Sequence, residues 1–308
     1  MAKGNMLLGY SKGSVGDVTF YRSGGSQRSR ARNRNPNNPR TERQQSQRSR
    51  FANAVKFYKQ VTTNFFRFAY EDKAVNESDY NAFMRHNVKR SGFIGYAASK
   101  VTNWPAVGLF EVSAGSLPPI AGRAVSDVIT FNFGDTATGE ERAAATTIGT
   151  LSNLLITKGN GIYREGDIIT LLLYCFKYRS TFPTVDTTSE GVKAESQFVQ
   201  FTLDTASTTA IASLEQTILN ESILVQMATG GLQISIDGDP SSSMCVMAAL
   251  IHSRNTSEGL KVSTQELIPS NATPVNAAMD TTGAYYSAVL ADWNAAAEAV
   301  LQGSASVN

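Results

Sequence analysis

The alternation of apolar and polar residues at the start of the chain predicts a β-hairpin. Val18 and Phe20 alternate with polar residues in Asp17–Arg22, the pattern of a strand with one apolar face. The segment Ser23–Ser26 places two glycines in a turn, because glycine adopts positive φ without steric cost. Residues 27–31 would form the returning strand.

Two helices are predicted after the hairpin. The first would begin near residues 39–42, capped by Asn38 with Pro39 at the first helical position, or by Thr41. Apolar side chains then recur at helical spacing and are expected to face the core. This stripe consists of Phe51, Val55, Tyr58, Val61 or Thr62, Phe65, and Phe68 or Ala69. A second helix is expected from Asn76 or Ser78.

Beyond residue 105 the pattern changes to short apolar runs separated by Gly, Ser, Thr, Asn and Asp, which is typical of a β-sandwich or barrel. The predicted strands are Val125–Phe133, Asp167–Tyr178, Gln197–Leu203, Ile223–Met227, Leu232–Ile236, Met244–Ser253 and Leu260–Leu267. Long helical stripes are absent from this part, and Tyr285–Leu301 predicts a C-terminal helix. The predicted class is α+β, mainly β, with jelly-roll and immunoglobulin-like topologies both open.

Charge divides the chain more sharply than its net charge of +2 indicates. Residues 1–100 hold 19 basic and 6 acidic residues, a net +13, which leaves −11 for residues 101–308. Such asymmetry is typical of a segment that faces a polyanion joined to a body with another role. We therefore predict two parts: a basic hairpin-and-helix part, 1–104, and a β-rich part with the C-terminal helix, 105–308.

Arginine is concentrated between residues 22 and 50, with no lysine and one acidic residue, Glu42. The candidate nucleic-acid-binding residues are Arg22, Arg28, Arg30, Arg32, Arg34, Arg40, Arg43, Arg48 and Arg50. The guanidinium group grips phosphate at two points, and residues 28, 30, 32 and 34 would share one face of a strand. Two other interpretations stay open: a solvated basic stretch, or contact with the acidic part of another copy.

Sequence signatures of enzymes are absent: the chain has no P-loop, dinucleotide-binding, zinc-protease or nucleophile-elbow motif. With two cysteines and two histidines, a disulfide scaffold is excluded and a zinc site is disfavoured. We therefore predict no enzymatic activity, no cofactor and no metal. The motif Asp237-Gly-Asp239 is interpreted as a turn.

Other polar and aromatic residues have structural interpretations. We expect most of the aromatic residues from 51 to 70 to lie in the core, although aromatics beside basic residues also stack on bases. His252 is expected to be structural, and His86, beside Arg85, Lys89 and Arg90, to add to the basic surface. Cys175 and Cys245 lie in predicted strands and are expected to act as small apolar side chains.

The chain shows neither a signal-length apolar segment at its start nor an apolar run long enough to cross a membrane. Its longest apolar run is Ile168–Phe176. We expect it to fold in a reducing cytoplasm without a membrane partner.

Two segments resemble a poorly characterised family of virion structural proteins, some labelled as capsid proteins. The first contains Gly13, Val15, Gly16, Asp17, Val18, Phe20, Tyr21, Arg22 and Gly25, and the second Asn38, Pro39, Arg40, Thr41, Gln44, Gln47 and Arg48. Members of this family are encoded by gut-metagenome viruses and phages with Bacteroidetes-type hosts. Residues 248–264 also look similar. The resemblance covers residues 1–70 best and implies a virion structural role without catalytic residues.

Together these features predict a self-assembling capsid protein that is located in the virion and assembled in the host cytoplasm. Its partners would be further copies, the viral genome and other virion proteins. The basic segment is either a flexible arm or an ordered hairpin exchanged between subunits. One alternative is a phage head-tail or tail-tube component that multimerises without genome contact. Another is a nucleic-acid-binding protein that does not assemble.

Overall fold

The computed structural model describes residues 12–23, 25–32, 40–61, 65–178, 182–187, 192–237 and 244–305, apart from the side chains of 23, 68 and 297–305. Contacts between Cα atoms group the chain into two compact units, Met1–Thr41 and Glu42–Asn308. The fold is α+β and mainly β, with an N-terminal sheet and a C-terminal helix, which confirms the predicted class.

The N-terminal unit contains an antiparallel sheet of three strands in the order β1-β2-β3. The strands are β1 (Gly13–Val15), β2 (Val18–Ser23) and β3 (Ser26–Ala31). Both turns use a glycine at positive φ, Gly16 at 55° and Gly25 at 81°, where a side chain would be strained. The predicted hairpin is thus confirmed, and β1 adds a third strand to it.

The body, unit Glu42–Asn308, begins with helix α1 (Glu42–Gln60), which starts within the predicted range. Its buried face matches the predicted apolar stripe only in part: Val61 is fully buried and Val55 and Tyr58 pack against the second core, whereas Phe51 is 48% exposed. The buried residues of α1 are Gln45, Ser49, Asn53, Ala54, Lys56 and Phe57. The prediction that Phe51 faces the core is therefore wrong. Polar side chains occupy the first half of the buried face, where they bond to backbone groups of other elements.

Two antiparallel sheets pack face to face in the body and form the predicted sandwich. One has the order β5-β6-β11-β10-β9, and the other β13-β12-β7-β8, with β15 also paired to β12. The first comprises β5 (Ala121–Val125), β6 (Val128–Asn132), β9 (Gln216–Ile218), β10 (Glu221–Ala228) and β11 (Gly231–Ile236). The second comprises β7 (Ile168–Lys177), β8 (Lys193–Thr202), β12 (Met244–Thr256), β13 (Gly259–Val262) and β15 (Ile268–Pro269).

Strand β7 lies between β12 and β8 and is buried on both faces, as its mostly apolar sequence predicts. Ile169, Leu171 and Leu173 point into the core between the two sheets. Leu172, Tyr174 and Phe176 point the other way, into a second core beneath the helices. The central strand of the sandwich thus joins two hydrophobic cores.

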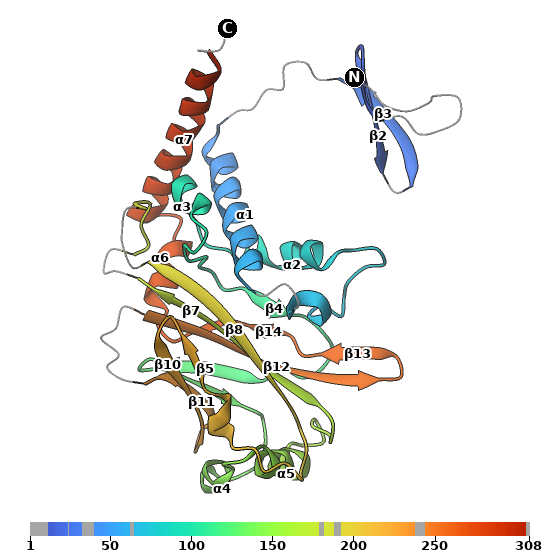
Figure 1. Ribbon diagram of the computed structural model, residues 1–308, viewed down its shortest axis with the longest axis vertical. Helices are drawn as coiled ribbons and strands as arrows, with labels where there is room; N and C mark the ends of the chain where they lie inside the picture. Colours follow the sequence, from blue (N-terminus) through green and yellow to red (C-terminus); the bar gives the residue numbers. More distant parts are fainter. Residues whose placement is uncertain are drawn as a thin grey trace. The chain divides into compact units, whose positions relative to one another are not determined.

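Helices cover the outer face of β7 and β12, and Figure 1 shows α1, α2, α3 and α7 on the same side of the two sheets. The remaining elements of this layer are η1 (Phe65–Phe68), α2 (Asp79–Asn87), α3 (Tyr96–Lys100), β4 (Glu111–Ser113), β14 (Gln265–Glu266), α6 (Thr273–Met279) and α7 (Ala284–Ala305). Phe57 of α1 stacks on Phe110, with ring centroids 4.0 Å apart. Helices α1 and α2 share this core with β7 and β12, so they belong to the same compact unit as the sandwich. The predicted functional division at residue 104 stays a prediction.

The sequence pattern predicts strands as the elements between residue 105 and the C-terminal helix, and it misses the short helices of this part. Two further helices, α4 (Gly139–Ala144) and α5 (Ile148–Lys158), lie at the end of the sandwich away from α1 (Figure 1). Each begins with a capping box, at Thr138 and Thr147. The predicted strand Leu260–Leu267 is also interrupted, because Ser263 and Thr264 separate β13 from β14.

Candidate nucleic-acid interface

Three of the candidate arginines project from one face of the N-terminal sheet. In the register of β2 and β3, Arg28 lies opposite Tyr21 and Arg30 opposite Thr19, so that these side chains share a face. Arg32 continues the alternation, with its backbone N–H donating to the Asp17 carbonyl at 2.6 Å. All three arginines are exposed. We call Arg28, Arg30, Arg32 and Tyr21 the arginine face.

The arginine face combines charge with an aromatic ring. The Arg30 guanidinium carbon lies 5.7 Å from the centre of the Tyr21 ring, within cation–π range. Alternate residues on a strand are about 7 Å apart, so the guanidinium groups form a row. Such a row grips successive phosphates, while Tyr21 offers a surface for a base. Strand parity, applied to β2 as well as to β3, would have placed Tyr21 here from the sequence.

The opposite face of the same sheet is apolar. Val18 and Phe20 lie on it, and Val15 lies opposite Val18 in β1. Val15 is 56% exposed and Val18 is 38% exposed. Arg22 projects from this face, opposite Gln27, so it does not join the arginine face. The sheet is therefore amphipathic, with a basic side and an apolar side.

The remaining candidate arginines lie outside the N-terminal sheet or outside the described residues. Arg34 lies outside the described residues. Arg40 is half-buried just before α1, and Arg43 is exposed in its first turn. Arg48 is half-buried and donates to the Gln45 side-chain oxygen at 3.3 Å. Arg50 is half-buried too, with its guanidinium carbon 4.5 Å from the centre of the Phe93 ring. Arg50 thus has a packing role within the body.

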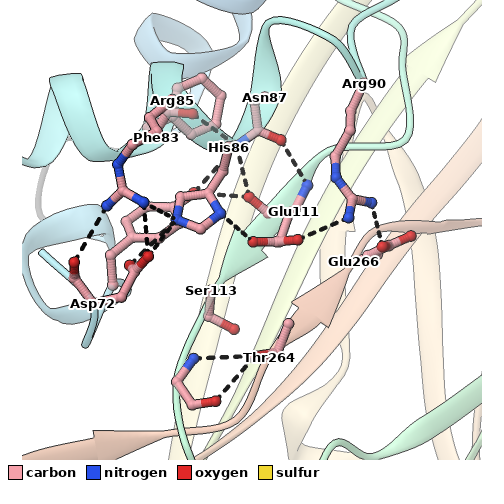
Figure 2. A network of polar contacts seen from close by, with 12 residues as sticks. Asp72, Phe83, Arg85, His86, Asn87, Arg90, Glu111, Ser113, Thr264 and Glu266 are labelled. Atoms are coloured by element: carbon pink, nitrogen blue, oxygen red, sulfur yellow. Dashed lines mark hydrogen bonds and ion pairs between the residues drawn. The ribbon is translucent and has the colours of Figure 1, made fainter.

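A network of compensated charges joins α2 to β4 and β14 (Figure 2). His86 lies between two carboxylates, with Nδ1 2.5 Å from Glu111 and Nε2 3.1 Å from Asp72. Arg85 binds Asp72 at 2.7 Å, and its hydrogen bond is the largest cause that lowers the pKa of the Asp72 carboxyl. Arg90 binds Glu111 at 2.9 Å. The expectation that His86, Arg85 and Arg90 extend the basic surface is wrong, since each is paired with a carboxylate.

A second polar cluster is buried at the end of β7 and β12. Arg254 holds the Asp167 carboxylate with both ends of its fork, at 2.7 Å and 2.6 Å. His252 lies 2.8 Å from the same carboxylate and is fully buried, which confirms its structural interpretation. Burial raises the pKa of Asp167, but the hydrogen bonds from Arg254 and His252 outweigh it and lower the pKa to about 2. This cluster is a buried network in which Arg254 and His252 both contact one carboxylate.

The aromatic residues after the arginines belong mainly to the second core, as predicted. Phe57 and Phe66 are fully buried, Tyr70 is nearly so, and Phe51 is the exposed exception. Both cysteines are buried, which confirms their prediction as small apolar side chains. Burial raises the pKa of the Cys245 thiol to about 11 and that of Cys175 well above its ordinary value. Neither thiol has the character of a reactive nucleophile.

Among the residues that the structure describes, no group of three or more Cys, His, Asp and Glu side chains is placed to hold a metal ion. Within the same part of the chain, each helix is too short or too polar to cross a membrane. The motif from Asp237 to Asp239 lies mostly outside the described residues.

Comparison with protein families gave one finding. The sequence profile of a family of unknown function, DUF6266, matches residues 10–165, about half of the chain, and includes the whole N-terminal sheet. Comparisons with curated proteins and with solved structures each gave no match.

Proposed function

The chain belongs to DUF6266, a family of unknown function, and we propose that it is a self-assembling structural protein of a virus particle that contacts nucleic acid through its arginine face. The observation that carries this proposal is the row of Arg28, Arg30 and Arg32 on one face of a small sheet, with Tyr21 beside it. The virion role rests on the resemblance of the N-terminal segments.

Single-stranded nucleic acid fits the arginine face because such a strand offers phosphates to the arginines and unpaired bases to Tyr21. Each guanidinium presents a planar fork of donors that matches two phosphate oxygens. Tyr21 stacks on one unpaired base regardless of its identity. The exposed Ser26, which lies two residues before Arg28 in β3 and so on the same face, adds a neutral hydrogen bond to sugar or phosphate. Binding of this kind is insensitive to sequence and sensitive to salt.

Assembly is supported by the apolar face of the same sheet. A unit as small as Met1–Thr41 does not bury its own apolar residues, and Val15 and Val18 stay exposed. The unit holds eight basic residues and one acidic residue, a net +7, against −5 for the rest of the chain. We propose that this face packs on the body of another copy, because the contact would bury Val15 and Val18 and leave the arginine face open.

Replacing the three arginines of the row by serine (R28S/R30S/R32S) is expected to weaken binding of a fluorescent single-stranded oligothymidylate by about 10- to 100-fold at low salt. The slope of log K against log[salt] should fall by about 2, since each phosphate contact contributes about 0.7. Fluorescence anisotropy from 50 to 300 mM salt measures both quantities.

The matched control for the arginine face lies in the same sheet. R22S removes an arginine from the opposite face, whereas R30S removes one from the row. R22S is expected to bind as the unchanged protein does. Equal losses in R22S and R30S, or unaltered binding by the triple variant, would show that the row is not the binding surface.

Substitution of the apolar face (V15S/V18S) is expected to shift the protein from large particles to small species. Size-exclusion chromatography with light scattering, at low and high salt and with absorbance at 260 and 280 nm, measures mass and nucleic-acid content together. V125S is the control, because Val125 is an equally exposed valine of the body. Rings or tubes without excess 260 nm absorbance would favour a tail component, and a salt-sensitive monomer or dimer would favour a protein that does not assemble.

A further inference from the structure

A pocket of about 510 Å³ opens between α1, α3 and β8, in the body and apart from the arginine face. Three lysines line it: Lys56 and Lys59 from α1 and Lys100 from α3. Serine, threonine, asparagine and glutamine side chains complete most of the polar wall. A volume of this size accommodates a small organic ligand.

The positive charge of this pocket is not compensated within the described part of the chain. The lysines that form ion pairs there are Lys73, Lys158, Lys177 and Lys261. Lys56 donates to the carbonyl of Val101, and the Lys100 ammonium lies 5.0 Å from the centre of the Tyr96 ring. Both are neutral partners.

One carboxylate, Glu195 of β8, also lines the pocket. Its Oε2 accepts from the backbone N–H of Leu219 at 3.3 Å, which directs that oxygen toward β9. A single carboxylate against three ammonium groups leaves the pocket with an excess of positive charge.

Lys56 shows the consequence of this excess. The side chain belongs to a residue that is 7% exposed, and burial together with the nearby Lys59 charge lowers the pKa of its amine to about 8. An isolated buried ammonium is costly, and an anion in the pocket would relieve both causes.

We propose that this pocket binds a phosphate group, carried by a free nucleotide or by a strand of nucleic acid. Lysine ammonium groups bind phosphate as point charges, and the neutral side chains of the wall supply hydrogen bonds to the remaining oxygens. The three lysines match the dianionic charge of a phosphate monoester better than the single charge of a carboxylate. None of the residues that line this pocket belongs to the arginine face, so this proposal stands even if the arginine face does not bind nucleic acid.

Isothermal titration of the full chain with inorganic phosphate, adenosine monophosphate and adenosine tests the proposal at pH 7. Phosphate and the nucleotide are expected to bind, and adenosine is not. Lys56→Met, which keeps the apolar stem, should weaken nucleotide binding at least 10-fold. Lys59→Gln, at an exposed position, should weaken it several-fold without any risk to folding. Lys89→Gln is the control, because Lys89 is an exposed lysine outside the pocket lining.

The pH dependence gives an independent readout. Since the pKa of Lys56 is about 8, affinity for the nucleotide should fall about 10-fold between pH 7 and pH 9 as the free amine loses its proton. At pH 8, binding should take up about half a proton, measured in buffers with different ionisation enthalpies. Three results would overturn the proposal. Adenosine could bind as well as the nucleotide, or neither phosphate nor the nucleotide could bind. The third is a nucleotide affinity that neither Lys56→Met nor Lys59→Gln changes.

The source of the phosphate is distinguished in the R28S/R30S/R32S background. In that background, residual binding of an oligothymidylate without terminal phosphate is measured with and without Lys56→Met. If Lys56→Met weakens this binding, the pocket binds the phosphates of a strand. If Lys56→Met weakens binding of the nucleotide but not of the oligothymidylate, the pocket binds a free nucleotide.

Discussion

Replacing Arg254 by methionine (R254M) is expected to destabilise the body by about 3–5 kcal/mol, the usual cost of removing one partner from a buried ion pair. Asp167 is almost fully buried and receives two hydrogen bonds from Arg254. Methionine keeps an apolar stem of similar length, so the packing loss is small. The Asp167 carboxylate would then remain in the interior with His252 and one backbone N–H as its hydrogen-bond partners.

Urea unfolding at pH 7, followed by tryptophan fluorescence, measures this loss. Trp104 is buried in the body and reports its unfolding. R164M is the control, because Arg164 is exposed and its hydrogen bonds to Asp167 are made by its backbone N–H and carbonyl. A midpoint for R254M that coincides with that of R164M would refute the assigned role of the ion pair.

The stability that R254M loses is expected to decrease at acidic pH. The folded-state pKa of Asp167 is about 2, below its ordinary value of 3.8, so the ion pair contributes stability above pH 4 and loses it as the pH falls toward 2. The stability difference between R254M and the unchanged protein should therefore shrink over this interval. A difference that stays constant down to pH 2 would place its origin in packing.

Elements whose causes are local could be predicted from the sequence. The turn glycines fix the hairpin of β2 and β3, and the Ser78 side chain caps α2 at one of the two predicted starts. The apolar run of β7 identified a strand buried on both faces. In each case the residues that determine the structure are neighbours in the chain.

Elements determined by distant partners could not be predicted. The N-terminal half of the buried α1 face is polar, since Ser49 exchanges hydrogen bonds with the backbone of Ile94 and Gln45 donates to Asn294 of α7. A periodicity search for apolar residues selects Phe51 instead. Helix α5 was missed for a different reason, because its stripe of Ile148, Leu151 and Leu155 is short and lies among strand-like segments.

In the candidate interface, too, features with local causes could be predicted and features that depend on distant partners could not. Strand parity predicted that Arg28, Arg30 and Arg32 share a face; the register places Arg28 and Arg30 together, and the backbone bond of Arg32 to Asp17 continues the pairing. The contact between Arg50 and Phe93 joins residues more than 40 positions apart, and no sequence pattern marks it. The lysine pocket likewise draws on α1, α3 and β8, so its charge becomes visible only when these elements are placed in space.

The buried polar face of α1 leads to the second large expected effect. Replacing Asn53 by alanine (N53A) is expected to destabilise the body by about 3 kcal/mol, since buried groups left without partners cost about 1–3 kcal/mol each. The Asn53 amide donates to the carbonyls of Gly92 and Val107, at 3.0 Å and 2.7 Å, and to the Ser91 hydroxyl at 2.9 Å. Its oxygen accepts from the Val107 N–H at 3.3 Å. This one side chain therefore joins α1 to two separate backbone segments.

Asn53→Leu separates the loss of these hydrogen bonds from the loss of volume. Leucine has the same number and branching of side-chain heavy atoms as asparagine, so it leaves no cavity, but it forms no hydrogen bonds; N53L should therefore be as unstable as N53A if the unpaired backbone groups cause the effect. If a cavity causes it, N53L should recover most of the stability. N153A, at an exposed asparagine of α5, should lie within about 0.5 kcal/mol of the unchanged protein in the same urea titration. Because the amide of Asn53 substitutes for backbone pairing between α1 and the segments at residues 91–92 and 107, we expect N53L to follow N53A.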